Sequence, residues 1–131
     1  MSSPRVSFQS DLGTFSAKFY LLAQRKNGEQ PSYFVVVSTG RGSALGWAFW
    51  REAYDQDGNK FTLARDAADV LSGGDVWEMS SALVGRKYLE AIKLSGTAWK
   101  IYGDHASDTF RITPNLIQGF LSRCDEQFKT Q

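Results

Sequence analysis

The sequence predicts an α+β fold: one compact domain with an antiparallel β-sheet, a short mid-chain helix and a long carboxyl-terminal helix packed against the sheet. Three observations support this prediction. Apolar and polar side chains alternate in the amino-terminal part, hairpin-turn residues follow, and a helical apolar stripe lies near the carboxyl end. The length of 131 residues suits a single domain (1–131), and 42% hydrophobic with 22% charged residues is a globular composition.

The first predicted feature is a β-hairpin. Side chains alternate from Phe15 to Gln24, which indicates a long strand. Lys26-Asn27-Gly28 predicts a turn, because Asn and Gly tolerate positive φ. The β-branched and aromatic stretch from Tyr33 to Thr39 then predicts the return strand, and the segment Gly40 to Ser43 ends it.

A second pair of strands is expected over Leu45 to Tyr54 and Lys60 to Leu63, on either side of a polar turn at 55–59. The alternation in the first of these strands places Trp47 and Phe49 toward the core. Trp50 and Tyr54 are then expected to face outward.

A short helix is predicted next. Asp66 can accept backbone hydrogen bonds as an N-cap, Asp69 follows three residues later, and the helix would continue through Leu71 to Gly73-Gly74. An edge strand is expected at Val6 to Gln9.

In the carboxyl-terminal half, Tyr88 to Leu94 fits a strand face or a helical stripe, and we predict a strand with the helix as the alternative. Strands are also predicted at Trp99 to Tyr102 and Thr109 to Ile112. Thr113-Pro114 predicts a helix start, with Thr as the cap and Pro at the first position. The apolar face of this last helix comprises Leu116, Ile117, Phe120, Leu121, Cys124 and Phe128. Cys124 is therefore expected to be a buried apolar residue and not a nucleophile.

An internal repeat is also consistent with the sequence, with units 6–74 and 75–131. A shift of 49 positions aligns Leu45 with Leu94, Trp50 with Trp99, Asp55 with Asp104 and Phe61 with Phe110. Each unit would then contain a strand, a polar turn, a second strand and a helix.

The opening hairpin carries a resemblance to a known architecture. Its residues are Lys18-Phe19-Tyr20-Leu21, the Asn27-Gly28 turn, Tyr33 to Val36 and the break at Gly40 to Ser43. Together with the repeated strands and helix, this hairpin resembles the Whirly and PUR-repeat single-stranded nucleic-acid-binding proteins. The resemblance covers Phe15 to Leu71, and the second half departs from it because its hairpin is neither basic nor clearly stranded.

One face of the expected sheet combines aromatic and basic side chains. Aromatic rings stack on bases, and Lys and Arg contact phosphates. Arg41 lies in Thr39 to Ser43, whose amides could hold a phosphate, although a flexible strand connection is the alternative. The candidate nucleic-acid-binding residues are Lys18, Tyr20, Arg41, Trp50, Tyr54, Lys60, Lys100 and Tyr102. The competing interpretation is that these aromatic residues pack in the core.

No motif in the sequence dictates a reaction. A single His105 and a single Cys124 do not supply a zinc site or a Cys/His pair. The polar turn at 55–59 lacks the spacing of an EF-hand loop, and Asp104-His105 with a nearby Ser has no reason to form a triad. We therefore expect no catalytic residue, no metal and no cofactor.

The predicted function is that of a non-catalytic protein that binds single-stranded nucleic acid through this sheet face. The alternative is a small protein-binding regulator or inhibitor that uses the same aromatic surface. The net charge of +1 favours neither. A lone cysteine, no secretory signal and no long apolar stretch predict a cytoplasmic protein without a membrane partner. An exposed edge at Val6 to Gln9 would allow a homo-oligomer.

Overall fold

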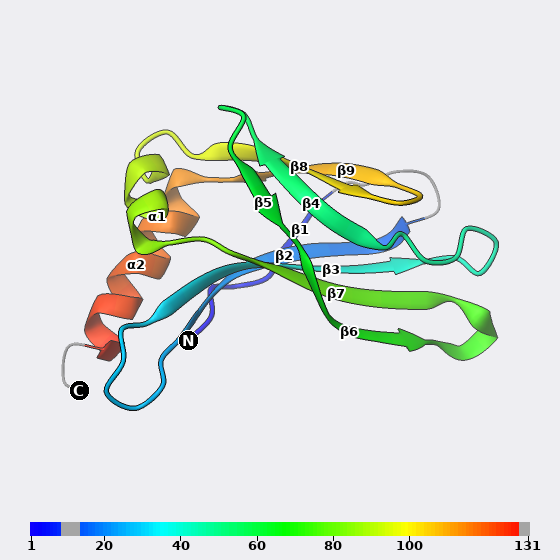
Figure 1. Ribbon diagram of the computed structural model, residues 1–131, viewed down its shortest axis with the longest axis horizontal. Coiled ribbons are helices and arrows are strands. Elements are labelled where there is room, and N and C mark those ends of the chain that lie inside the picture. Colours follow the sequence, from blue (N-terminus) through cyan, green and yellow to red (C-terminus); the bar gives the residue numbers. More distant parts are fainter. Residues whose placement is uncertain (9–13, 129–131) are drawn as a thin grey trace.

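The computed structural model describes residues 1–8 and 14–128 and arranges them as two antiparallel sheets with two helices at one end (Figure 1). The α+β prediction is confirmed. The five-stranded sheet has the order β1-β2-β3-β7-β6, and the four-stranded sheet has the order β5-β4-β8-β9. The strands are β1 (Val6–Ser7), β2 (Thr14–Gln24), β3 (Ser32–Arg41), β4 (Trp50–Asp55), β5 (Lys60–Thr62), β6 (Ala64–Val70), β7 (Val76–Leu83), β8 (Thr97–Gly103) and β9 (Ser107–Ile112). The two helices are α1 (Arg86–Ile92) and α2 (Pro114–Phe128), and a single 3-10 turn, η1 (Ser72–Gly74), connects β6 to β7.

The opening hairpin has the predicted form. β2 and β3 pair in antiparallel register, with Ala23 opposite Tyr33. The turn closes where Glu29 N–H donates to Lys26 O at 3.0 Å, and Gly28 adopts a φ of +76° that favours glycine. The expected edge strand is present as the two-residue β1, while Gln9 and the side chain of Phe15 lie outside the described part of the chain.

The core lies between the two sheets and is closed by the helices. Phe19 stacks on Phe110 with 4.4 Å between ring centroids, and Trp99 stacks on Phe61 at 4.6 Å. The predicted last helix is confirmed as α2, where Leu116 N–H donates to the cap oxygen of Thr113 at 3.3 Å. The face that α2 buries holds Ile117, Phe120, Leu121 and Cys124. Burial raises the pKa of the Cys124 thiol, so this group is a packing residue, as predicted.

Three local predictions are wrong. Residues 66–70 form most of strand β6 and not a helix, because this strand pairs with β7, and Leu71 follows the strand. The stretch 88–94 was predicted as a strand, but α1 covers most of it, since Leu89 and Ile92 are buried at helical spacing. Residues 45–49 precede β4 and are not in a strand.

Strand β7 was not predicted. Its buried side chains are Val76, Glu78, Ser80 and Ala82. Two polar residues among these inward positions obscure the apolar alternation by which a strand is recognised. The strand forms because it lies between β3 and β6 and pairs with both. The two units of the suggested repeat agree only in part. The hairpins β4–β5 and β8–β9 lie in one sheet, whereas the segment expected to be the helix of the first unit is strand β6.

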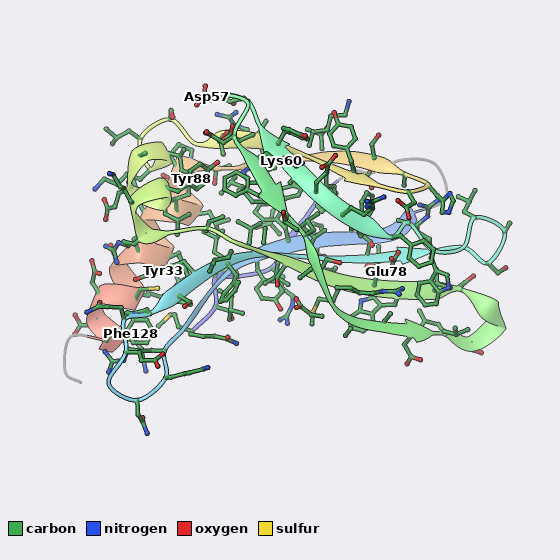
Figure 2. The ribbon with its side chains drawn as sticks, in the orientation of Figure 1. Tyr33, Asp57, Lys60, Glu78, Tyr88 and Phe128 are labelled. Atoms are coloured by element: carbon green, nitrogen blue, oxygen red, sulfur yellow. The ribbon has the colours of Figure 1, made fainter. Side chains whose placement is uncertain are left out.

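A hydrogen-bonded cluster attaches α1 to the β4–β5 hairpin (Figure 2). Tyr88 O–H donates to Asp55 Oδ2 at 2.6 Å, and Trp99 Nε1–H donates to the Tyr88 oxygen at 3.1 Å. Asp55 also accepts from the amides of Asp57 and Asn59 and from Asn59 Nδ2. Burial acts to raise the pKa of the Asp55 carboxyl, but these hydrogen bonds outweigh it and hold that pKa below its usual value.

We expect Tyr88→Phe to lower the free energy of unfolding by about 1–3 kcal/mol, because it removes a hydrogen bond to a carboxylate. Urea denaturation measures the change. Tyr54→Phe is the matched control, since the Tyr54 hydroxyl has no hydrogen-bond partner among the described residues. Equal urea midpoints for both variants would contradict a contribution of the Tyr88–Asp55 hydrogen bond to stability.

The depressed pKa of Asp55 predicts a pH dependence. The native state holds the carboxylate better than the unfolded chain does, so this stabilisation is complete above the unfolded pKa of about 3.9 and is lost as pH falls through the lower native pKa. Asp55→Asn should therefore flatten the decline of unfolding free energy below about pH 4. Asp57→Asn, which removes an exposed carboxylate from the same turn, should retain the decline seen in the unsubstituted protein.

Candidate nucleic-acid interface

The outward side of the four-stranded sheet gathers polar, aromatic and basic residues, and we call it the outer face. It follows from strict alternation: Ala53, Trp99, Ile101 and Phe110 point into the core, and their neighbours point away. The members of the outer face are Glu52, Tyr54, Lys60, Thr62, Ala98, Lys100, Tyr102, Ser107, Thr109 and Arg111.

Strand register arranges these residues in rows across the sheet. In one row Tyr54 lies between Lys60 and Lys100, its direct partners on β5 and β8. In the next row Tyr102 lies opposite Glu52. Directly opposite residues have Cβ atoms about 4.5–5.5 Å apart, so each ring is within reach of a charged group.

The aromatic rings of the outer face contact each other and a cation. Tyr54 and Tyr102 meet edge to face, with 5.9 Å between ring centroids and an interplanar angle of 80°. Lys100 Nζ lies 5.3 Å from the centroid of the Tyr102 ring. Such a contact is favourable because the ring face is negative and the ammonium is positive.

The charges of the outer face are mostly positive. Lys60 Nζ lies 3.2 Å from Glu52 Oε2, and this carboxylate raises the pKa of Lys60. Arg111 donates from Nη2 to the carbonyl of Ser95 at 3.0 Å. Three cations therefore share the surface with one carboxylate, although the whole chain is almost neutral.

Four of the eight predicted residues come together on the outer face: Tyr54, Lys60, Lys100 and Tyr102. Lys18 and Tyr20 lie on β2 in the other sheet. Lys18 is exposed, but Tyr20 is buried, with the Arg5 guanidinium 4.6 Å from its ring centroid. These two residues therefore cannot share one binding surface with the other four.

Arg41 was expected to present its guanidinium to a phosphate on the surface, and this expectation is wrong. The residue ends β3 and is 5% exposed. Its Nε and Nη1 atoms are buried and have no hydrogen-bond partner within the described part of the chain. A phosphate in solvent cannot reach them.

The expectation that Trp50 faces outward is also wrong. Trp50 is 4% exposed and donates from Nε1 to Thr39 Oγ1 at 2.8 Å. Phe49 before it has a φ of +55°, and a bulge lies between Trp50 and Glu52. The extra residue of a bulge reverses the alternation, so Trp50 points inward while Glu52 and Tyr54 point outward.

Trp50→Ala should lower the free energy of unfolding by about 3–5 kcal/mol, because it leaves a large cavity in the core. Thermal or urea unfolding measures this. Tyr54→Ala on the outer face should cost clearly less. Equal costs for the two substitutions would contradict the core position of Trp50.

Sequence reasoning missed Arg111 and Thr109 as members of the outer face. The signal was present, because Thr109 and Arg111 alternate with the core residues Phe110 and Ile112 in a stretch already predicted to be a strand. Their partners across the sheet are Lys100 and Ala98.

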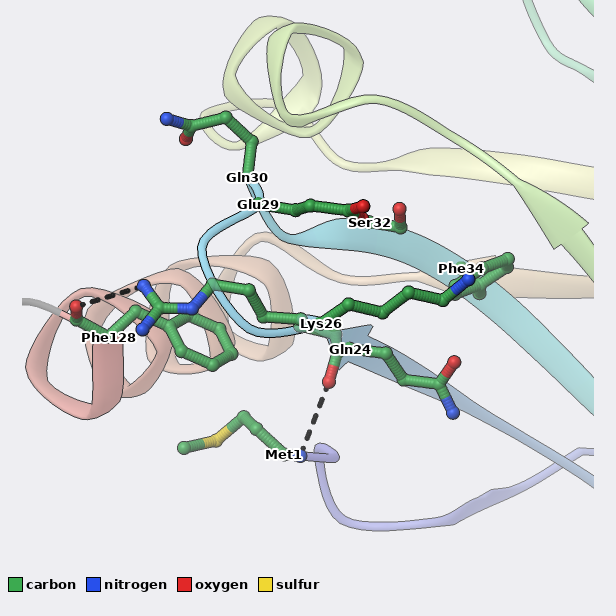
Figure 3. Close-up of a pocket in the computed structure, with 10 residues that line it drawn as sticks. Met1, Gln24, Lys26, Glu29, Gln30, Ser32, Phe34 and Phe128 are labelled. Atoms are coloured by element: carbon green, nitrogen blue, oxygen red, sulfur yellow. Dashed lines mark hydrogen bonds between the residues drawn. The ribbon is translucent and has the colours of Figure 1, made fainter. Parts of the chain in front are cut away.

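A separate hollow of about 720 Å³ lies between the β2–β3 hairpin and the end of α2 (Figure 3). Arg25 crosses it, with its guanidinium carbon 5.4 Å from the centroid of the Phe128 ring and Nη1 donating to Phe128 O at 3.4 Å. Lys26 and Glu29 lie at the same hollow and bring opposite charges to it. It is not continuous with the outer face, because it belongs to the other sheet.

Within residues 1–8 and 14–128, no group of three or more His, Cys, Asp or Glu side chains is placed to hold a metal ion. None of the helices in the described part has the length and apolar character needed to cross a bilayer.

Comparison with known proteins gives no relative. No protein-family model matches the chain, and neither the curated proteins nor the solved structures contain a significant match.

Proposed function

We propose that this chain is a non-catalytic protein that binds single-stranded nucleic acid on the outer face. The observation that carries the proposal is the row Lys60, Tyr54, Lys100 with Tyr102 beside it: two aromatic rings interleaved with two cations on an open sheet. The helices lie at the end of the sheets and leave this face uncovered (Figure 1).

The chemistry of each group supports this function. An unpaired base has an exposed π-face, which a Tyr ring can cover, and each such stack contributes about 1–3 kcal/mol. Lys60, Lys100 and Arg111 would contact phosphates of the same nucleic-acid strand, and neutralised phosphates release counterions. A duplex keeps its bases stacked inside, so the rings favour a single strand.

The resemblance to Whirly and PUR-repeat proteins is part of the same proposal. It is supported by antiparallel hairpins combined with two helices and by an aromatic and basic sheet surface. The structure differs from the expected repeat at β6, because this strand stands where the first unit was expected to have its helix. A cytoplasmic location is also proposed, on the ground of the single, buried cysteine.

The test is fluorescence anisotropy of labelled single-stranded DNA and RNA at two salt concentrations. We expect saturable binding that weakens with salt. The single variants Tyr54→Ala and Tyr102→Ala should each weaken the binding free energy by about 1–3 kcal/mol. Lys100→Ala should weaken binding to all sequences and reduce the salt slope by about 1.

Lys26→Ala is the matched control for charge, because Lys26 is exposed on the β2–β3 turn and lies away from the outer face. It should leave the affinity unchanged. Absence of binding at low salt would refute the proposal and favour the alternative, a protein-binding regulator or inhibitor that uses Tyr54 and Tyr102 as anchors.

A further inference from the structure

Three connections meet at the end of the molecule opposite the helices: β3 to β4, β6 to β7, and β8 to β9 (Figure 1). Hydrogen bonds join them. Ser43 N–H donates to Asp75 Oδ1 at 3.1 Å, Asp104 N–H to Phe49 O at 3.3 Å, and His105 N–H to Ala48 O at 3.2 Å. This end therefore holds its residues in a defined arrangement.

A buried carboxylate fixes the residue before β4. Glu78 is 1% exposed and accepts from Ala48 N–H at 2.8 Å and from Phe49 N–H at 2.9 Å (Figure 2). Arg65 Nη2 lies 3.6 Å from the same carboxylate. A buried charge with these partners is costly to disturb, so the backbone at 48–49 is firmly held.

The conformation held in this way is strained. Phe49 has a φ of +55°, the only positive φ among the described residues other than glycine. A bulky residue rarely adopts this left-handed conformation, and strain of this kind is concentrated at functional sites. Glycine would avoid the strain, yet the chain has phenylalanine here, which points to a role for the ring.

The ring is placed for contact with a partner. Phe49 is 37% exposed, with its centroid 6.0 Å from that of His105 and 6.3 Å from that of Trp47. The Arg65 guanidinium carbon lies 5.2 Å from the Phe49 centroid and 4.6 Å from the Trp47 centroid. The exposed rings are those of Phe49 and His105. Trp47 and Arg65 support the Phe49 ring, which makes it a rigid surface for stacking.

Along the chain, this cluster lies next to the end of the outer face, before β4 and in the turn after β8, and Arg65 of β6 packs on it. Glu52 pairs with Tyr102 and Trp50 with Gly103, so Phe49 and His105 follow directly beyond the last row of the outer face. Gly103 allows the close approach, since a Cβ there would lie 2.3 Å from Ala48 O. Arg51, whose side chain is 71% exposed, lies between the two regions, with Nη1 2.8 Å from Asp104 Oδ1.

We propose that Phe49 and His105 form a further base-stacking position for the strand that binds the outer face, with Arg51 contacting phosphate between Tyr102 and this position. The inference rests on the proposed function. The strained backbone would then fix the Phe49 ring in position, so that a nucleic-acid strand running past Tyr102 stacks its next base on this ring. Leu45, Val70 and Leu71 are also exposed apolar residues of this end, so Leu45→Gly is included in the experiment as a control.

The test is Phe49→Gly, which removes the ring and accepts the observed φ without strain. We expect the variant to remain folded, because relief of the strained φ offsets part of the lost ring contacts, and to have an affinity for an oligonucleotide of about 16 residues that is at least about fivefold lower. Binding of an oligonucleotide of about 4 residues, which the outer face alone can cover, should not change. Phe49→Asn, which also tolerates positive φ, is the second variant if the glycine variant does not fold.

Leu45→Gly is the control for a general effect of removing an exposed apolar side chain from this end. Unchanged affinity of a folded Phe49→Gly variant for the longer oligonucleotide would overturn the inference and leave the proposed function intact. Equal losses for Phe49→Gly and Leu45→Gly would also overturn it, because the effect would not depend on a ring. No binding of either oligonucleotide to the unsubstituted protein would refute the proposed function itself.

Discussion

The buried carboxylate of Glu78 determines how the four-stranded sheet begins. It lies on β7 of the other sheet and accepts the amides of Ala48 and Phe49, so the five-stranded sheet fixes the chain just before β4. Phe49 is thereby held at a positive φ, and the following bulge sets which residues of β4 point inward. Directly after this contact between the sheets, Trp50 points into the core and Tyr54 to the surface.

The helices complete the core at one end and do not cover the sheets. α1 is attached by Tyr88 to the β4–β5 hairpin, and Arg86 joins it to α2 through two hydrogen bonds to Asp125, at 2.7 and 3.1 Å. The Asp125 carboxylate raises the pKa of Arg86, so the guanidinium stays charged in this position. Since the helices are held at the end, they leave the outer face uncovered.

The outer face shows how a nearly neutral chain can present a basic surface. Alternation along β4, β8 and β9 sends apolar residues inward, and the lysines and Arg111 share the opposite side with two tyrosines. Arg86, by contrast, is engaged with Asp125 and Glu90 between the helices. The local distribution of charge, and not its sum, is therefore the property relevant to a polyanion.

The sequence by itself determined the long hairpin, the strands β5, β8 and β9, the helix α2 and the burial of Cys124, because period, turn residues and caps act within a few positions of the chain. It also placed Tyr54, Lys60, Lys100 and Tyr102 on one side of a sheet. Only the tertiary structure decided β6, β7 and α1, where pairing with a distant strand or packing on the core overrides local preference. The burial of Arg41 at the end of β3 is likewise decided by the tertiary structure. The reversal at Trp50 belongs to the same class, since a bulge and a contact from Glu78 act across the fold and leave no periodic trace in the sequence.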